Sequence, residues 1–348
     1  MPDDKTERQA QMLANRLVKK FKHLSKWAQR TGAGTFRLYD RDIPEIPLVL
    51  DYYSGENSGG AVSGALYKRP SEKDEDEETL WLETMRRAAA EALGIQAGDV
   101  YLKQRQRQRG ANQYEKQSNR GLIRIVRENA LRYKVNLSDY LDTGLFPDRR
   151  LLRAMLRQCA AGKRVLNLFC HTGSFSLAAA AGGAYASCSV DLSNTYLNWA
   201  QENFSLNKIK SRLICLKDYW PCRKYRTHAL IRADALVFLK EAEQASCKWD
   251  MIILDPPAFS NSKKMTGVLD LKRDYLRLLE QCLALLSPDG ELWLSINAKT
   301  FSVNSSGLTE KLKPAYPDLR IADLTRQMTD EDFRGRKVPQ TFLIRNSG

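Results

Sequence analysis

The chain has 348 residues, a formal net charge of +14 at pH 7, a pI near 9.4 and a mean hydropathy of -0.48. This length favours two domains, because domains commonly contain roughly 100–200 residues. No apolar run reaches the ~18 residues of a membrane-spanning helix, and the charged segment 1–20 is unlike a secretion signal, so we expect a cytoplasmic protein that binds no membrane. Seven scattered cysteines without a Cys-x-x-Cys pair, and only three histidines, indicate reduced thiols and no metal site.

The first part of the chain is expected to form an N-terminal helical segment, residues 1–30, followed by a small α+β domain, residues 31–138. Apolar residues recur at helical spacing from Lys5 to Arg30, and glycines at 32 and 34 end the pattern. The following residues predict strands at Phe36–Tyr39, Leu48–Tyr53, Val100–Arg107, Leu122–Val126 and Arg132–Leu137, a glycine-rich turn or loop at Ser54–Gly64 and a helix at Thr79–Leu93.

Positive charge is concentrated between Lys103 and Lys134, where ten basic residues stand against two acidic ones. Such density favours a polyanionic partner, since neutralising phosphates releases counterions; the alternative is a solvated basic face. Alternation along a strand would place the basic side chains of its first part on one face, and nearby tyrosines could stack on bases. The residues expected to bind RNA here are Lys103, Arg105, Arg107, Arg109, Tyr114 and Lys116.

Residues 139–348 alternate strand-like and helix-like segments, which predicts a mostly parallel sheet in an α/β domain. The expected strands are Val165–Phe169, Ala186–Val190, Ala229–Arg232, Met251–Leu254, Glu291–Ile296, Leu319–Asp323 and Gln340–Ile344. The expected helices are Phe175–Ala181, Asn194–Leu206, Ala235–Glu243 and Lys272–Leu286.

The most informative segment is Asp255-Pro256-Pro257-Ala258-Phe259, which directly follows an apolar strand. Proline gives no N–H to a sheet, so the chain must leave the sheet there, at the carboxyl end where α/β folds bind ligands. A carboxylate, two exposed carbonyls and an aromatic ring could hold a planar nitrogenous base. We take Asp255, Pro256, Pro257 and Phe259 as candidate catalytic residues; the alternative is an ordinary exit from a strand.

A tight turn with one glycine, Gly173, follows the first strand of this domain and precedes a helix. Such a turn presents free backbone N–H groups to a ligand, although it lacks the G-x-G-x-x-G pattern of dinucleotide sites. Asp191 ends the next strand, where it could accept from both hydroxyls of a ribose, and Asp234 ends the third, where it could accept from an adenine amino group. With Asp255, three carboxylates at successive strand ends would surround an adenosine and a substrate.

Arg150 and Arg153 lie one helical turn apart, before the first of these strands, and can reach the same partner. The residues leave two partners open. One is Asp148 in a structural ion pair, and the other is the carboxylate of an amino-acid-like cofactor.

Six segments together resemble the class I S-adenosylmethionine-dependent methyltransferases, and most closely the branch that methylates guanine N7 of bacterial large-subunit rRNA. They are Leu24–Asp51, Gln104–Gln117, Val135–Arg153, Leu166–Ser174, Val190–Ala200 and Leu254–Lys264. The resemblance implies a seven-stranded Rossmann-like methyltransferase domain at 139–348, after a small RNA-binding domain, and S-adenosylmethionine as the cofactor. It implies cofactor contacts from Asn167, Phe169, Cys170, His171, Thr172, Gly173, Ser174, Asp191, Leu192, Ser193, Ala233, Asp234, Ala235 and Asp255.

The chain departs from this family in two respects. Arg212–Arg226 looks like an insertion before the third strand, and the guanine-N2 half of the fused relatives is missing, so only one activity is expected. Near the end of the chain, Phe333, Arg334 and Arg336 are further candidates for contacts with the target nucleotide and its RNA.

We therefore expect methyl transfer to a guanine nitrogen of 23S rRNA or a large-subunit precursor. N7 is favoured because its lone pair needs no prior proton removal. Guanine-N2 and adenine-N6 remain alternatives because Asp-Pro-Pro-aromatic groups suit exocyclic amines, whereas a protein glutamine would leave the basic domain unexplained. Cytosine C5 is disfavoured, since no cysteine lies between Asp255 and Arg277. A non-catalytic RNA-binding assembly factor is the alternative from another class.

Overall fold

The computed structural model describes residues 3–67, 74–104, 121–140, 142–222, 226–260, 268–298 and 301–346. The chain divides into two compact units, Met1–Pro147 (unit 1) and Asp148–Gly348 (unit 2). The N-terminal helix belongs to unit 1, and this unit extends beyond residue 138, where the sequence pattern placed the end of the first domain.

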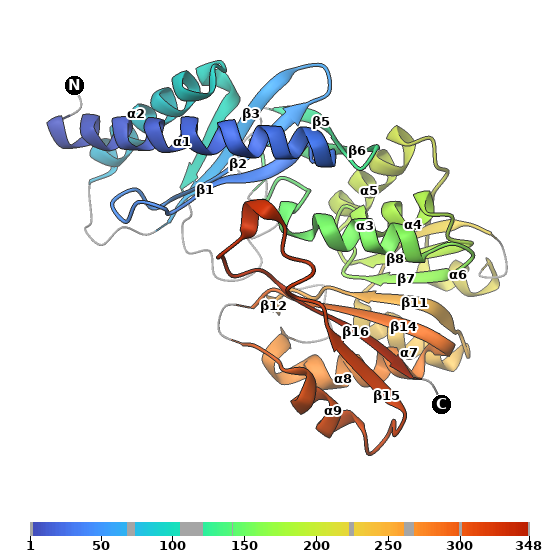
Figure 1. Cartoon of the computed structure of the whole chain (residues 1–348). Helices are drawn as coiled ribbons and strands as arrows, with labels where there is room; N and C mark the ends of the chain where they lie inside the picture. The colour runs from blue at the N-terminus through green and yellow to red at the C-terminus, as the bar shows by residue number, and fades with distance from the viewer. Residues whose placement is uncertain are drawn as a thin grey trace. The chain divides into compact units, whose positions relative to one another are not determined.

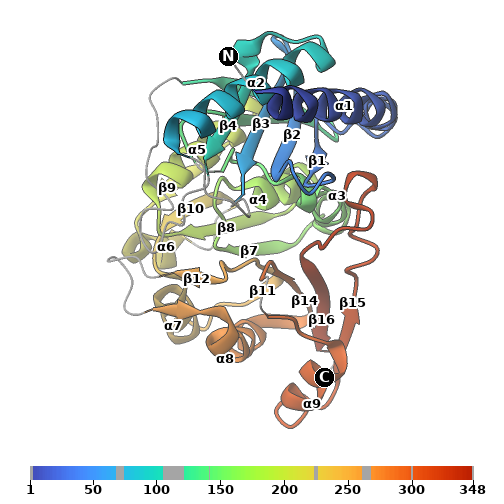
Figure 2. The same ribbon diagram turned by 90° about the vertical axis from the view of Figure 1, so that its left-hand side faces the viewer.

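Unit 1 is a sheet covered by two long helices (Figures 1 and 2). Its elements are α1 (Asp4–Thr31), β1 (Thr35–Asp40), β2 (Leu48–Gly55), β3 (Gly59–Leu66), α2 (Glu75–Leu93), the 3-10 helix η1 (Ala97–Asp99), β4 (Val100–Gln104), β5 (Ile123–Glu128) and β6 (Leu131–Asn136). The strands follow the order β4-β3-β2-β5-β6, and β1 pairs with β2. Leu13, Leu17 and Leu24 of α1 lie in a core with Trp81 and Met85 of α2.

The predicted turn or loop over Ser54–Gly64 is confined to residues 56–58, because the rest of this segment belongs to the strands of the β2–β3 hairpin. Gly60 and Gly64 allow the two strands to approach. A Cβ on Gly60 would lie 2.0 Å from the Tyr52 hydroxyl, and one on Gly64 would lie 2.4 Å from Leu50 Cδ2. Glycine here makes room for the side chains of the neighbouring strand, so it marks a tightly packed strand where the composition suggested a loop.

Unit 2 is a sheet with helices on both faces (Figures 1 and 2). Its elements begin with η3 (Pro147–Arg149), α3 (Arg150–Cys159), β7 (Arg164–Leu168), α4 (Ser174–Ala181), β8 (Ala186–Asp191), α5 (Asn194–Leu206), β9 (Arg212–Ile214), α6 (Leu216–Cys222), β10 (His228–Arg232) and α7 (Ala235–Gln244). They continue with β11 (Trp249–Leu254), β12 (Phe259–Ser260), β13 (Leu269–Asp270), α8 (Leu271–Ala284), β14 (Leu286–Ile296), α9 (Ser305–Leu312), β15 (Leu319–Asp323), η4 (Glu331–Phe333) and β16 (Gln340–Asn346).

The main sheet has the order β15-β16-β14-β11-β7-β8-β10-β9, which corrects the expected seven strands to eight among the described residues. The extra strand, β9, is short, lies at the edge and pairs in parallel with β10. It comes from the segment expected to be an insertion. Successive strands lie on one side of β7 as far as β10, and β11 then pairs on its other side. Ligands of open α/β sheets bind at the carboxyl ends of strands at such a reversal.

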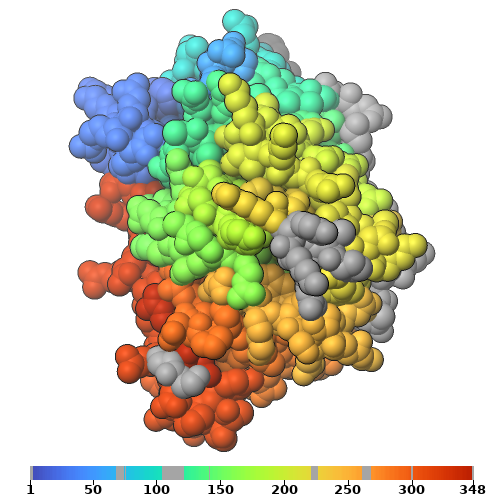
Figure 3. All heavy atoms as spheres, turned by 90° about the vertical axis from the view of Figure 1, so that its right-hand side faces the viewer, coloured from blue at the N-terminus to red at the C-terminus, as the bar shows by residue number. Residues whose placement is uncertain are grey.

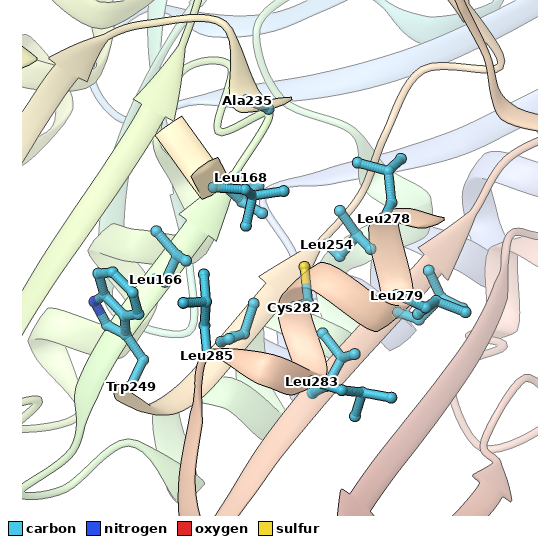
Figure 4. Packing of buried hydrophobic residues seen from close by; sticks show 14 of the residues in the cluster. Leu166, Leu168, Ala235, Trp249, Leu254, Leu278, Leu279, Cys282, Leu283 and Leu285 are labelled. Carbon is cyan, nitrogen blue, oxygen red and sulfur yellow. The ribbon is translucent and has the colours of Figure 1, made fainter. Parts of the chain in front are cut away.

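Alternating residues of the central strands enter two cores. Leu166, Leu168 and Leu254 pack with residues of α8, including Leu278, Leu279 and Cys282 (Figure 4). Val165, Met251 and Ile253 face α3 and α4 on the other side. The space-filling view shows the green and yellow segments of unit 2 closely packed at its surface (Figure 3). The burial of both faces explains why the central strands are continuous apolar runs.

None of the described helices combines the length and apolar character that a membrane crossing requires. Over the described ranges, no group of three or more His, Cys, Asp or Glu side chains is arranged to hold a metal ion.

Candidate functional site

The turn after β7 is shaped by three residues in the left-handed region, Phe169, His171 and Gly173, with φ of 58°, 50° and 70°. The amide of Cys170 donates to the carbonyl of Val190 at 3.0 Å, which ties the turn to β8. Gly173 is the N-cap of α4 and provides no side-chain hydrogen bond to the first turn. The backbone N–H groups at this helix start are therefore available to an anionic or hydroxyl-bearing ligand.

Gly173 is required for space as well as for its φ angle. A Cβ at this position would lie 2.8 Å from Cβ of Ala200 in α5. The turn is thus held between the end of β8 and the body of α5.

Asp191 lies at the end of β8 and organises the turn through both carboxylate oxygens. Oδ2 accepts from the His171 amide at 2.8 Å, and Oδ1 accepts from the Ser193 amide at 2.9 Å. Burial raises the pKa of Asp191 above its ordinary value of 3.8, and the amide hydrogen bonds oppose part of this rise. Each oxygen keeps a lone pair for a further donor, so the residue could accept from the two hydroxyls of a ribose.

Asp234 lies two residues after the end of β10 and is buried, with 8% of its surface exposed. It is the N-cap of α7, where Oδ1 accepts from the Leu236 amide at 2.8 Å. Its neighbours Ala233 and Ala235 are buried as well. Asp191, Asp234 and Asp255 therefore lie at, or within two residues of, the ends of β8, β10 and β11, at the same edge of the sheet.

Asp255 is engaged by a residue that the sequence reasoning did not single out, Arg149. The guanidinium forms a two-pronged ion pair, with Nη2 at 2.9 Å from Oδ1 and Nε at 3.2 Å from Oδ2. Asp148 lies 3.3 Å from the remaining Arg149 nitrogen. Burial alone would lower the pKa of Arg149, but the two carboxylates outweigh burial and raise it, so the guanidinium stays charged. In the sequence, Arg149 is distinguished only by its position directly before Arg150, which was considered as a partner of a carboxylate.

Arg150 has partners that were not among the two predicted. Its guanidinium binds Asp330 Oδ2 at 2.9 Å and Asp332 Oδ1 at 2.7 Å, so it fastens the segment around η4 to α3. Arg153, one turn later, is also buried, with 2% of its surface exposed. The structure thus favours a structural role for Arg150 over contact with a cofactor carboxylate.

The Asp-Pro-Pro-Ala-Phe segment contains a fixed carboxylate and, four residues later, an exposed ring. Half of Phe259 is exposed, although it lies in the short β12–β13 pairing, whereas Pro256 is buried and Pro257 half-buried. An exposed phenylalanine in this position can stack on a planar base.

The other cofactor candidates lie at the end of β7, in the turn, at the start of α4 or just after β8. Asn167 is fully buried, and its Nδ2 donates to Ser176 Oγ at 2.8 Å; Ser189 donates to the same oxygen at 2.7 Å. Burial raises the pKa of the Cys170 thiol well above its ordinary value, so this cysteine is not a ready nucleophile. Thr172 is buried too, while Leu192 and Ser193 are partly exposed after Asp191. Ser174 begins α4.

The structure tests only part of the predicted RNA surface. Arg105, Arg107, Arg109, Tyr114 and Lys116 lie outside the described residues. The amine of Lys103 donates to the carbonyl of Tyr140, and burial lowers its pKa to about 8. Lys103 therefore serves a contact within unit 1 and is not an exposed phosphate-binding lysine.

The candidates near the end of the chain are of different kinds. Phe333 is a buried ring, with 4% of its surface exposed. Arg334 is exposed and forms an ion pair of 3.0 Å with Glu331, while Arg336 is half-buried. Of these three candidates, Arg334 and Arg336 are accessible to solvent and Phe333 is not.

The chain matches the model of a protein family described as S-adenosylmethionine-dependent methyltransferase over residues 48–325. It is 40% identical to ribosomal RNA large subunit methyltransferase K of Neisseria meningitidis over 333 residues, covering 96% of this chain and 86% of the relative. It is 41% identical to ribosomal RNA large subunit methyltransferase K/L of Hahella chejuensis over 340 residues, which covers 97% of this chain but 43% of that protein. The chain thus spans less than half of the longer K/L relative.

Among solved structures, the chain is similar to SMU.776, which was crystallised with SAH. The TM-score is 0.70 and the identity 23%, with 97% of this chain and 81% of the other covered. At this identity the likeness supports the fold alone. The backbone N–H groups at the Gly173 turn and the carboxylates of Asp191 and Asp234 are groups that could hold an adenosyl moiety with its amino-acid tail. From the family match and its relatives, the chain belongs to the S-adenosylmethionine-dependent methyltransferases, in the group that includes ribosomal RNA large subunit methyltransferase K.

Proposed function

We propose that the chain transfers a methyl group from S-adenosylmethionine to a guanine nitrogen, N7 favoured, of 23S rRNA or its large-subunit precursor. The names of the relatives support the large-subunit rRNA substrate. The observation that carries the choice of nitrogen is the engagement of Asp255: both of its oxygens already accept hydrogen bonds from a buried guanidinium, and the ring of Phe259, four residues later, is exposed.

The cofactor supplies an electrophilic methyl group on a sulfonium sulfur. The residues of this chain have to hold the reacting groups in place. Phe259 would stack on the guanine, and a free lone pair of Asp255 would accept from its N1–H or 2-amino group. Since N7 carries its own lone pair, the chain needs to place that atom roughly 3 Å from the methyl group, and no side chain has to remove a proton. A guanine in a folded rRNA helix would first be flipped out of its stack.

Transfer to guanine N2 or adenine N6 is the competing reaction, and it ends with a proton lost from an amine. Both oxygens of Asp255 already accept hydrogen bonds from Arg149, an arrangement that suits a carboxylate holding a base in position better than one taking a proton from an amine. This consideration favours N7. The non-catalytic alternative, an RNA-binding assembly factor, does not account for the order maintained around Asp191 and Gly173.

The proposal is tested by incubating the purified chain with S-adenosylmethionine and unmodified large-subunit rRNA, digesting the RNA and identifying the methylated nucleoside by mass spectrometry. We expect 7-methylguanosine. Appearance of N2-methylguanosine or N6-methyladenosine would overturn the choice of N7. Absence of any methylated nucleoside, with cofactor binding intact in calorimetry, would support the non-catalytic alternative.

The raised pKa of Asp191 predicts how cofactor affinity depends on pH. Burial moves the folded-state pKa upward, so Asp191 takes up a proton at a higher pH than an ordinary aspartate. The protonated carboxyl is a weaker acceptor for ribose hydroxyls. The affinity for S-adenosylmethionine should therefore be highest at neutral pH. It should fall as the pH drops through the raised pKa of Asp191, by an amount that approaches about tenfold per pH unit.

Calorimetric titration with S-adenosylmethionine at several pH values checks this prediction. Asp191→Asn should bind more weakly and lose the pH dependence. Asp250→Asn is the matched control, because Arg164 and Ser287 hold the pKa of Asp250 down to about 2 against the effect of burial. An unchanged pH dependence in the Asp191 variant would contradict the assigned contact.

A further inference from the structure

Helix α1 carries a large excess of positive charge. After Glu7 it contains no acidic residue up to its end at Thr31. Four of its cations, Lys19, Lys22, Lys26 and Arg30, are spaced by three, four and four residues. Because residues three or four apart share one face of a helix, these four side chains form a single row, which we call the α1 stripe.

The α1 stripe lies on the face of the helix opposite to its core contacts. All four of its residues are exposed, whereas Leu13, Leu17 and Leu24 are buried in the core of unit 1. Figure 1 shows α1 lying along the sheet of unit 1. The helix is thus held as a rigid support with one face turned to solvent.

The α1 stripe is also free of internal partners over the described parts of the chain, where no hydrogen bond or ion pair engages its side chains. Two other cations of the same helix behave differently. Arg16 and Lys20 both bind Asp42, at 2.8 and 2.6 Å. The fold therefore neutralises the cations that face the body of unit 1 and leaves the outward row unneutralised.

We propose that the α1 stripe binds the phosphodiester backbone of the rRNA substrate. The choice of RNA as the partner rests on the proposed function. At about 1.5 Å of rise per residue the row extends over about 16 Å, which suits several phosphates along a strand. It includes no aromatic side chain for stacking, so its contribution is affinity and orientation without base readout. A membrane surface is the less suitable partner, because the apolar face that would enter lipid is already buried.

The test compares two fourfold variants of the full chain that lose the same charge. The stripe variant carries Lys19→Gln, Lys22→Gln, Lys26→Gln and Arg30→Gln. The control variant carries Lys217→Gln, Lys240→Gln, Lys313→Gln and Arg320→Gln, which are exposed cations scattered over unit 2. Glutamine preserves helix propensity, and circular dichroism melting curves should confirm that both variants fold as the unchanged chain does.

Binding to large-subunit rRNA is measured as a function of salt, without methyl transfer. The slope of log affinity against log salt should decrease by about 0.7 for each lost phosphate contact, or about 3 for the stripe variant, with an affinity loss of tenfold or more near 0.15 M salt. The control variant should stay close to the unchanged chain. Equal slopes for the unchanged chain and the stripe variant would overturn the proposal, as would equal losses in both variants.

Failure of the proposed function would be seen separately. If the unchanged chain binds rRNA but methylates none of its guanines, the enzymatic proposal fails while the salt slopes still decide the role of the α1 stripe. Binding of the unchanged chain to vesicles of anionic phospholipid, lost in the stripe variant while rRNA binding persists, would assign the row to a lipid surface and overturn the RNA assignment.

Discussion

Replacing Arg149 with Gln is expected to lower kcat for methyl transfer by about a hundredfold or more, with little change in the KM for S-adenosylmethionine. The guanidinium holds both oxygens of Asp255, so its loss leaves that carboxylate free to rotate and to recruit water. A displacement of about 1 Å at a positioning residue can cost about 10²-fold in rate. Stability should also fall by about 3 kcal/mol, because removing one partner of a buried pair leaves the other charge unmatched.

A second variant separates positioning from folding. Arg149→Lys keeps the charge but not the two-pronged geometry, so it should retain most of the stability and still lose about tenfold in kcat. If Arg149 acts through Asp255, the double variant Arg149→Gln with Asp255→Asn should be no slower than Asp255→Asn alone. Additive losses in this cycle would show that Arg149 has a role independent of Asp255.

Unit 2 contains a matched control for this pair. Arg164 at the start of β7 binds Asp250 of β11 in the same two-pronged way, at 2.9 and 3.0 Å. That pair lies at the amino ends of the strands, whereas Arg149 meets Asp255 at the carboxyl end of β11. Arg164→Gln should cost about 1 kcal/mol or less, because the pair is partly exposed, and should leave kcat unchanged. A comparable loss of kcat in both variants would contradict the assigned role.

The second large effect is expected at Gly173, where alanine should lower stability by about 2–5 kcal/mol and weaken cofactor binding strongly. The φ of +70° costs an alanine about 1–2 kcal/mol, and its Cβ would lie 2.8 Å from Ala200. Relieving that overlap requires the turn or α5 to move, at a further cost of about 1–3 kcal/mol. Movement of the turn would also disturb the amide of His171 on Asp191. Denaturant unfolding and calorimetry with S-adenosylmethionine measure the two effects.

Gly94 provides the control for backbone strain alone. Its φ is +63°, and a Cβ there would meet nothing within 4 Å, so Gly94→Ala should cost about 1 kcal/mol and leave cofactor affinity unchanged. Adding Ala200→Gly to Gly173→Ala should restore part of the lost affinity, since it removes the overlap but not the strain. Equal stability losses at Gly94 and Gly173, with cofactor binding retained, would show that the close approach to Ala200 is unimportant.

Local sequence patterns were sufficient to predict many of the helices and strands of this protein. The spacing of apolar residues predicted α1, the buried strands of unit 2 and helix α5. This was possible because the hydrophobic period of a helix or strand can be recognised within a short segment of the chain. The proline pair after Leu254 marked the exit of β11 for the same reason, since proline ends a ladder wherever it stands. Asp191 and Asp234 could be placed at strand ends, which in a parallel sheet lie at one edge.

Only the tertiary structure decided which side chains meet. Arg149 and Asp255 are 106 positions apart, and Arg150 reaches Asp330 and Asp332 over a still longer separation. No local period encodes such a pairing, because it depends on how strands and helices are brought together. The same reason explains why the role of Lys103 was not predicted. The sequence suggested that this lysine binds phosphate, but in the structure its amine donates to the carbonyl of Tyr140 in its own unit. The glycines of β3 are a further example. Their composition suggested a loop, whereas in the structure the absence of a Cβ allows β3 to pack closely against the side chains of β2.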